Sequence, residues 1–227
     1  MLFALFTACD KDTNEVKPLE YGTVTDVDGN TYKTVKIGDQ WWMCENLNVA
    51  HYNDGSAINL IDIGVLDSSW SNAVEGSYCF INDSIYGKLY NYNAVTDSRK
   101  LAPEGWHIPS DEEWQTMEKS IGMSDAEAAS SAWRGTNQAE KLVIKSSVGW
   151  PVSSLLFGTD EVGFSALPGG IRVIDGSTNT FQTTAFWWSS TSESNKVYYR
   201  YIDFQHKQIF RQLTYPQYGM SIRCVKN

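Results

Sequence analysis

The second half of the chain carries short blocks in which large aromatic residues stand beside turn-forming glycine and proline. These blocks begin at Gly105, Gly163, Trp187 and Gly219, and read Gly-Trp-His-Ile-Pro, Gly-Phe-Ser-Ala-Leu-Pro-Gly-Gly, Trp-Trp-Ser-Ser-Thr and Gly-Met-Ser-Ile-Arg-Cys-Val. Large rings fill volume where regular elements are few. None of the blocks has the spacing of a metal site, a nucleophile elbow or a phosphate loop. They therefore predict an irregular, loop-rich core and indicate a fold more clearly than a reaction.

Earlier blocks begin at Asp26, Val35 and Tyr86, and read Asp-Val-Asp-Gly-Asn-Thr-Tyr, Val-Lys-Ile-Gly-Asp-Gln-Trp-Trp-Met and Tyr-Gly-Lys-Leu-Tyr-Asn-Tyr. In their order along the chain and in their amino-acid sequences, all these blocks resemble the Fibrobacter succinogenes major paralogous domain, a family of secreted bacterial modules. The resemblance covers residues 21–227. It implies an α+β, C-type lectin-like fold with short antiparallel strands, two principal helices and long loops. Formylglycine-generating enzymes use the same scaffold, but the resemblance implies no defined activity for the family itself.

Composition favours a packed globule over a disordered chain. The 227 residues include 9 Trp, 12 Tyr and 9 Phe, and only 20% are charged, which is unlike disordered segments. We find no internal repeat, low-complexity tract or linker in residues 21–227, and interpret this region as a single domain. The formal charge of −9 argues against nucleic acid or an anionic membrane surface as a partner, because both attract basic patches.

The first residues indicate where the protein is located. Residues 1–9 form an apolar run that ends at Cys9 and resemble the end of a bacterial lipoprotein signal, with Phe6-Thr7-Ala8-Cys9 as the lipobox. The run is too short for a complete signal, so we expect the true start upstream; a chance hydrophobic terminus is the alternative. Residues 10–20 are polar and suit a flexible tether. We therefore expect lipidation of Cys9, export, and anchoring to the bacterial outer membrane or cell surface.

Three further cysteines remain at Cys44, Cys79 and Cys224. Export implies an oxidising compartment in which a pair could be bridged, although sequence alone does not fix the pairing. In lectin-like folds, a cysteine on the last strand bridges back to the region of the first helix. The resemblance therefore favours a disulfide between Cys79 and Cys224.

The N-terminal part is predicted to be a meander of strands. Residues 21–27 and 31–37 flank Asp28-Gly29-Asn30, a strong hairpin signal, and residues 40–46 follow as a third strand. Residues 53–78 are expected to form a long loop anchored by Trp70.

Helices are predicted next along the chain. Apolar spacing favours a first helix from Tyr86 to Thr96. The second runs from Ser110 to Ile121, because Ser110-Asp111-Glu112-Glu113 is a capping box. Ser124 repeats this pattern and opens a short third helix. A closing strand is expected from Met220 to Val225, in one core with the N-terminal strands.

Several patterns resemble catalytic or metal sites but lack a required part. Asp26 to Asn30 begins like a calcium loop without its later acids, so we expect a hairpin turn. Ser165 lies in an incomplete nucleophile elbow and is interpreted as structural. The histidines, at 51, 107 and 206, lie far apart and suggest no zinc site. Glu112 and Glu113 do not form a general-acid pair, because one of them caps a helix. We therefore predict no catalytic residue, no metal and no cofactor.

Aromatic and polar residues near the end of the chain suggest where a ligand could bind. Trp41-Trp42 and Trp187-Trp188 could stack on sugars, although core packing is the simpler interpretation. Residues 198–204 alternate like a half-buried strand. The polar stretch from Gln205 to Tyr218 follows, and loops near the last strands of lectin-like folds commonly carry ligand contacts. Its candidate ligand-binding residues are His206, Arg211, Tyr215 and Tyr218.

Three classes of function fit these observations. The preferred one is a non-enzymatic, lipid-anchored binding or adhesion module for a glycan or a surface protein, with its anchor as the sole contact with membrane. The second is an enzyme of the formylglycine-generating type, suggested by the shared scaffold. The third is a structural envelope or fimbria-associated component. The sequence leaves the ligand and the oligomeric state open.

Overall fold

The computed structural model describes residues 18–63, 68–81, 84–145, 148–151 and 158–227. Cys9 and residues 10–17 of the expected tether lie outside these ranges. No helix in the described part of the chain is long and apolar enough to cross a membrane.

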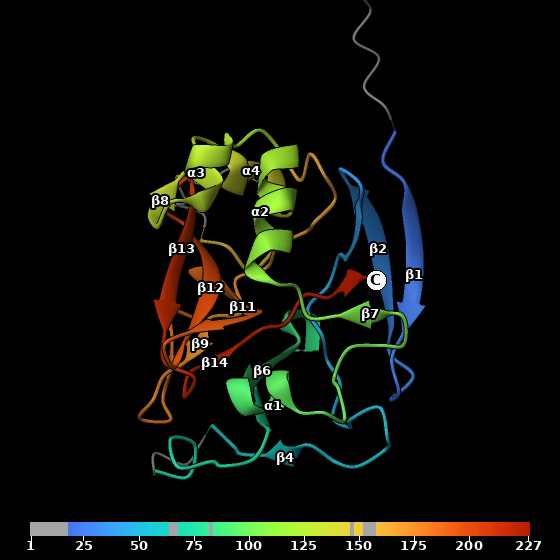
Figure 1. The fold of residues 1–227 in the computed structure, drawn as a ribbon, viewed down its shortest axis with the longest axis vertical. Helices are drawn as coiled ribbons and strands as arrows, with labels where there is room; N and C mark the ends of the chain where they lie inside the picture. The colour runs from blue at the N-terminus through green and yellow to red at the C-terminus, as the bar shows by residue number, and fades with distance from the viewer. Residues whose placement is uncertain (1–17, 64–67, 82–83, 146–147, 152–157) are drawn as a thin grey trace, which may run out of the picture.

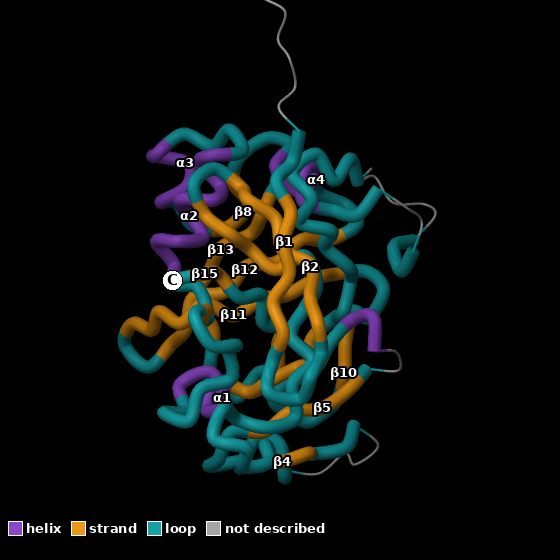
Figure 2. The backbone as a smooth tube through the Cα atoms, turned by 90° about the vertical axis from the view of Figure 1, so that its right-hand side faces the viewer, coloured by secondary structure: helices purple, strands orange, loops and turns teal. Residues whose placement is uncertain are grey.

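The first sheet joins the two ends of the described chain. Its antiparallel strands follow the order β1-β2-β3-β15-β7, and comprise β1 (Tyr21–Thr25), β2 (Thr31–Ile37), β3 (Gln40–Met43), β15 (Val225–Lys226) and β7 (Trp106–His107). The predicted hairpin of β1 and β2 is confirmed, and the third strand is shorter than expected. Because β15 pairs with β3 and β7, the last strand lies inside the N-terminal sheet, as predicted (Figures 1 and 2).

The β1–β2 turn uses the Asp26 carboxylate internally. Asp26 Oδ1 accepts the amides of Asp28 and Asn30 at 3.0 and 2.9 Å, and Oδ2 accepts the Tyr32 hydroxyl at 2.6 Å. A carboxylate with these partners closes a turn, so the expected hairpin interpretation is confirmed here.

The second sheet has the order β10-β9-β14-β6-β5-β4. Its strands are β4 (Asn59–Leu60), β5 (Ser77–Phe80), β6 (Lys88–Asn91), β9 (Ile171–Arg172), β10 (Thr178–Asn179) and β14 (Gly219–Met220). Outside β4, the described residues of the predicted long loop before β5, 53–58, 61–63 and 68–76, form no helix or strand, as predicted. Within it, Trp70 is buried and its Nε1 donates to Gln217 O at 2.8 Å.

The predicted first helix is wrong over its N-terminal half. A 3₁₀ turn (Ser84–Tyr86) precedes strand β6, and helix α1 spans only Tyr92–Thr96. All four residues of β6 are buried, and periodicity cannot distinguish a short, enclosed strand from a buried helix. The boundary lies at Asn91, whose side chain accepts the amide of Ala94 at 3.0 Å and caps α1.

The predicted closing strand is divided in two. β14 belongs to the second sheet and β15 to the first, with Ser221–Cys224 crossing between them. The start of this crossing is tightly packed, since a Cβ on Gly219 would lie 2.6 Å from Trp70 Cζ2. Buried Arg223 holds the crossing, because it donates to Asn46 Oδ1 at 2.9 Å and to Cys44 O at 2.7 Å. One sequence block thus connects two sheets.

The third sheet is antiparallel with the order β11-β12-β13-β8. It comprises β11 (Thr184–Glu193), β12 (Lys196–Asp203), β13 (Ile209–Thr214) and β8 (Ala132–Arg134). The expected half-buried strand at residues 198–204 corresponds to β12. The stretch from Gln205 to Tyr218 is less loop-like than predicted, because most of its centre is β13.

The helices after β7 gather at one end of the molecule (Figure 1). They are α2 (Asp111–Ser120), α3 (Asp125–Ala129) and α4 (Gln138–Leu142). The predicted capping box of α2 is confirmed: Ser110 Oγ accepts from Glu113 N at 3.2 Å, and Glu113 Oε2 accepts from Ser110 N at 2.8 Å. Ser124 caps α3 in the same way. The described architecture is therefore mostly β with short helices, a coarse α+β arrangement.

Strand β11 separates two hydrophobic cores. Trp187 packs in a cluster with Trp42 and Trp114, whereas Trp188 packs in the second cluster with Tyr90. The ring centroids of Trp42 and Trp114 are 4.9 Å apart. Adjacent residues on a strand point to opposite faces, which places the two tryptophans in different cores. Because Trp42, Trp187 and Trp188 are all buried, these pairs do not present the sugar platform considered above.

The predicted disulfide is not formed. Cys44, Cys79 and Cys224 are free and buried. Cys79 lies in a small cluster beside Trp70, whereas Cys224 lies in the core of Tyr90 and Trp188. Because these clusters are distinct, the expected pairing of Cys79 with Cys224 is wrong in this structure.

Candidate functional site

The third sheet turns a layer of rings outward. Along β12, Tyr199 and Tyr201 point to the opposite face from Arg200, as alternation requires. Tyr201 lies opposite Phe186 of β11 and Phe210 of β13. We define the aromatic face as six half-buried side chains of this sheet and its β12–β13 connection: Trp133, Phe186, Tyr199, Tyr201, His206 and Phe210.

The rings of the aromatic face form one connected layer. The centroid of Tyr201 lies 4.5 Å from Phe210, 5.0 Å from Phe186 and 4.9 Å from Trp133. His206 stacks on Trp133 at 3.9 Å with an interplanar angle of 18°. These distances lie within or close to the range of favourable aromatic pairs, so the rings hold one another in place.

A hollow of about 480 Å³ opens beside this layer. Phe186, Tyr199, Tyr201 and Tyr218 contribute rings to it, and the polar residues of its lining are Thr180, Thr183, Thr184, Asp203 and Thr214. Burial raises the pKa of Tyr201 to about 12 and that of Tyr199 further still. Both phenols are therefore protonated hydrogen-bond donors at neutral pH. The hollow combines apolar ring surface with hydroxyl and carboxylate groups.

The structure brings two of the predicted ligand residues to this region. Tyr218 lines the hollow, and His206 belongs to the aromatic face, with its Nδ1 2.8 Å from Asp203 Oδ1. Tyr215 lies outside the hollow lining, is 53% exposed, and has Lys196 Nζ 5.2 Å from its ring centroid.

Arg211 corrects the prediction, because it points to the inner face and is 6% exposed. Its Nη2 donates to Asp111 Oδ2 at 2.6 Å and its Nε donates to Asp111 Oδ1 at 2.9 Å. On β13, Arg211 and Phe210 are neighbours and so face opposite ways. Arg211 is therefore not an exposed ligand-binding side chain.

The inner face holds a buried ionic network under α2. Glu118 accepts from Arg134 Nη2 and Arg200 Nε at 2.7 Å each, and Asp111 Oδ1 accepts from Arg200 Nη1 at 2.8 Å. Burial alone would raise the pKa of Asp111, but the hydrogen bonds and charges of Arg211 and Arg200 outweigh it and lower the pKa to about 2. Because these charged groups pair with one another, we interpret the network as structural.

The histidines outside the aromatic face have separate internal partners. His107 Nε2 lies 2.7 Å from Glu113 Oε1 and Nδ1 lies 2.6 Å from Asn227 Oδ1, and His51 Nδ1 lies 2.6 Å from Asp28 Oδ1. Within the described part of the chain, no group of three or more His, Cys, Asp or Glu residues is placed to hold a metal.

Ser165 has the structural role that the sequence predicted. Its hydroxyl donates to Asp160 Oδ2 at 2.7 Å, and its amide donates to Asp160 Oδ1 at 2.8 Å. Its φ of 54° lies in the left-handed region. The turn is thus held by a carboxylate rather than arranged around a base.

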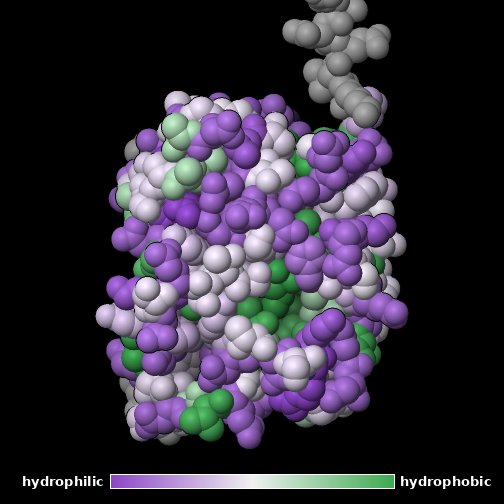
Figure 3. Space-filling model, viewed as in Figure 1, coloured by the Kyte–Doolittle hydropathy of each residue, from purple (hydrophilic) through white to green (hydrophobic). Residues whose placement is uncertain are grey.

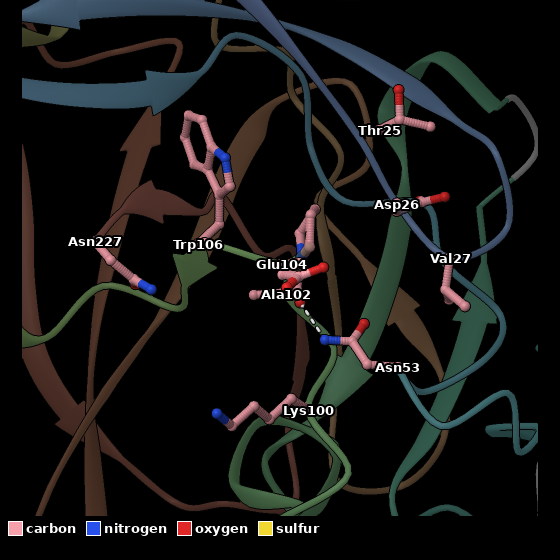
Figure 4. A pocket seen from close by; sticks show the side chains of 11 residues that line it. Thr25, Asp26, Val27, Asn53, Lys100, Ala102, Glu104, Trp106 and Asn227 are labelled. Carbon is pink, nitrogen blue, oxygen red and sulfur yellow. Dashed lines mark hydrogen bonds between the residues drawn. The ribbon is translucent and has the colours of Figure 1, made fainter.

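A second concavity surrounds Trp106 (Figure 4). We call it the Trp106 groove. It consists of a larger hollow of about 520 Å³ and a smaller hollow of about 330 Å³. Lys100, Ala102, Trp106 and Asn227 line both parts. On the same side of the molecule, apolar residues line a hollow near the middle of the face (Figure 3).

Sequence reasoning missed most of the aromatic face. The sequence predicts an alternating strand that contains Tyr199 and Tyr201, but no pattern in it indicates which strands lie beside this one. Phe186, Phe210 and Trp133 join them through pairing between β11, β12, β13 and β8. The available signal was the recurrence of rings at alternate positions, which predicts a shared face only once the strand register is known.

The chain belongs to the Fibrobacter succinogenes major domain family, whose family model matches residues 35–226. This match confirms the family that the aromatic-glycine blocks indicated. A search of curated proteins and a search of solved structures each found no match.

Proposed function

We propose that this protein is a non-enzymatic binding module of the bacterial cell surface and that its aromatic face takes a saccharide. The observation that carries the proposal is the hollow beside Phe186, Tyr199, Tyr201 and Tyr218. Aromatic rings offer apolar area with a fixed orientation, while hydroxyl and carboxylate groups near them provide directional hydrogen bonds.

A sugar fits this mixture better than a purely apolar ligand. A pyranose presents apolar C–H surface on its faces and hydroxyl groups around its rim. The hollow likewise offers rings beside the Thr214 hydroxyl and beside Asp203. Asp203 Oδ1 already accepts the amides of Gln205 and His206, whereas Oδ2 contacts His206 Nδ1 at 2.9 Å, so Oδ2 is the carboxylate oxygen with more capacity for a sugar hydroxyl. A surface protein is the alternative ligand, because tyrosine and tryptophan are also enriched at protein interfaces. A structural envelope component would use the face in that second way.

The buried thiols favour binding over the formylglycine-generating alternative. Burial raises the pKa of Cys44 and of Cys79 to about 11, and raises that of Cys224 further. A thiol is reactive as its thiolate, which these environments disfavour at neutral pH. Formylglycine formation on a cysteine-containing substrate peptide would refute the non-enzyme proposal.

The finer fold and the location remain parts of this proposal. Pairing of β15 with β3, together with short strands and short helices, supports a C-type lectin-like arrangement. The apolar run before Cys9 supports a lipid anchor on the outer membrane or cell surface. Mass spectrometry of membrane-extracted protein, expressed with its upstream sequence, should find diacylglyceryl-modified Cys9; an unmodified Cys9 in the soluble fraction would refute the anchor.

A glycan array tests the proposed ligand class. We expect the wild type to retain one or more glycans and the double variant Tyr199→Ala/Tyr201→Ala to lose at least tenfold in affinity. A tenfold loss corresponds to about 1.4 kcal/mol, within the range of an aromatic hot spot. Tyr198→Ala is the matched control: it removes a tyrosine from the same strand, but one whose ring lies 4.3 Å from the Arg211 guanidinium.

Each outcome separates the proposed functions. Glycan binding that both variants retain would place the site elsewhere. No binding on the glycan array, combined with retention of an envelope protein on a parallel protein array, would favour the structural component.

A further inference from the structure

The lining of the Trp106 groove includes apolar side chains, and most of its ionisable groups already have partners within the protein. Its smaller hollow is lined by the apolar side chains of Val95, Leu101 and Ile108 together with Trp106. Apart from Lys100, the charged or ionisable side chains of this hollow already have partners within the protein. Asp97 accepts from Arg99 Nη2 at 2.7 Å, and His107 contacts Glu113 and Asn227.

Lys100 differs from these engaged groups. Its ammonium forms no hydrogen bond or ion pair with any residue in the described ranges. Figure 4 shows the amide nitrogen of Asn227 beside Trp106, the Lys100 ammonium lower in the same view, and Glu104 between Trp106 and Lys100. Glu104 lines the larger hollow and not the smaller one, so Lys100 is the one charged side chain without an ion-pair partner in the described lining of the smaller hollow.

The backbone at Lys100 is left-handed, as at seven other non-glycine residues of the described chain, and its amide donates to Asp97 O at 3.0 Å. Its φ is 62°, a left-handed conformation that glycine adopts without cost and that a lysine adopts with strain. The preceding turn is held by Arg99, whose Nε and Nη2 both donate to Asp97 at 2.9 and 2.7 Å. The loop therefore holds a long cationic side chain where glycine would fit the backbone better.

We propose that the Trp106 groove binds a small carboxylate with an apolar body, such as an aryl or aliphatic acid. Trp106, Leu101 and Ile108 pack against the body, while Lys100 pairs with the carboxylate. Asn227 offers its amide nitrogen as a second donor. This site is separate from the aromatic face and does not depend on the saccharide proposal.

Phenylacetate and phenylacetamide test the proposal as a charged and neutral pair of the same shape. Each is titrated into the full ¹⁵N-labelled chain, and the indole N–H signal of Trp106 is followed after its assignment with Trp106→Phe. We expect both compounds to shift this signal and phenylacetate to bind about three- to fivefold more tightly, the size expected for an exposed ion pair. Added salt should reduce this preference.

The variants assign the preference to Lys100. Lys100→Gln should make the two affinities equal, whereas Lys196→Gln, which neutralises an exposed lysine beside Tyr215, should leave the preference intact. Lys100→Gly should also abolish it while raising the midpoint of thermal unfolding, because glycine relieves the left-handed backbone. Tyr201→Ala should change neither titration.

Four results would overturn the proposal. The first is that neither compound shifts the Trp106 signal. The second is equal affinity in the wild type, and the third is a preference that survives Lys100→Gln. A lower unfolding midpoint for Lys100→Gly would be the fourth, because it would show that the lysine stabilises the loop and that its conformation is not held for a ligand.

Discussion

On strand β12, Arg200 points to the inner face of the third sheet, while Tyr199 and Tyr201 point to the outer face. The inner face is polar and closed: Arg200 is 0% exposed and pairs with Asp111 and Glu118. The outer face is aromatic and half-buried, and a hollow opens beside its rings. Two faces that share one strand thus differ in both chemistry and access to solvent.

This difference shows that charged residues alone are a poor guide to a binding site. Arginine is a residue type common in binding hot spots, but the guanidinium of Arg211 donates its hydrogen bonds to Asp111 inside the protein. The rings of Tyr199 and Tyr201 line an open hollow. Side chains whose bonding capacity is already used stabilise the fold, whereas those that line open space are available to a ligand.

The largest effect on stability is expected when a charge is removed from the inner face. Glu118→Gln should lower the free energy of unfolding by about 3–5 kcal/mol, because it leaves Arg134 and Arg200 buried with one charged partner fewer. Chemical denaturation measures the loss, and Glu112→Gln on the exposed side of the same helix should change it by less than about 0.5 kcal/mol. Equal effects of the two substitutions would show that the inner network contributes little.

Lowering the pH should reduce the free energy of unfolding by a smaller amount. The pKa of Asp111 is lowered from 3.8 to about 2 in the folded protein, so its contribution to stability is present above about pH 4 and is lost as pH falls through 2. The contribution should be roughly 2 kcal/mol, since each unit of pKa shift corresponds to about 1.4 kcal/mol. Urea unfolding of the wild type and of Asp111→Asn should differ most at neutral pH and converge toward pH 2. A difference that stays constant would assign the stabilisation to shape rather than charge.

Local signals in the sequence predicted the parts of the fold that depend on few residues. The β1–β2 hairpin and the α2 capping box follow from turn and cap chemistry, and both formed as expected. Residues 88–91 were wrongly assigned to a helix, because a strand that is buried on both sides loses the alternation that would identify it. The division of the closing block into β14 and β15 depends on packing between two sheets, which no local pattern encodes.

The candidate site could be predicted only in part for the same reason. The stretch from Gln205 to Tyr218 includes strand β13, and its Tyr218 lines the hollow. Whether each side chain faces inward or outward depends on strand register. The sequence shows Phe210 and Arg211 as neighbours, but only the sheet shows that the first joins the rings and the second joins the ionic network.

The smallest expected effect is that of Tyr215→Ala, a residue that the sequence predicted to bind ligand. Tyr215 is 53% exposed, and the Lys196 ammonium lies 5.2 Å from its ring centroid, so loss of the ring should change the free energy of unfolding by less than about 0.5 kcal/mol. Because Tyr215 does not line the hollow, the variant should also retain any glycan that the wild type binds on the array. Loss of that glycan without loss of stability would extend the ligand surface from the aromatic face over the end of β13.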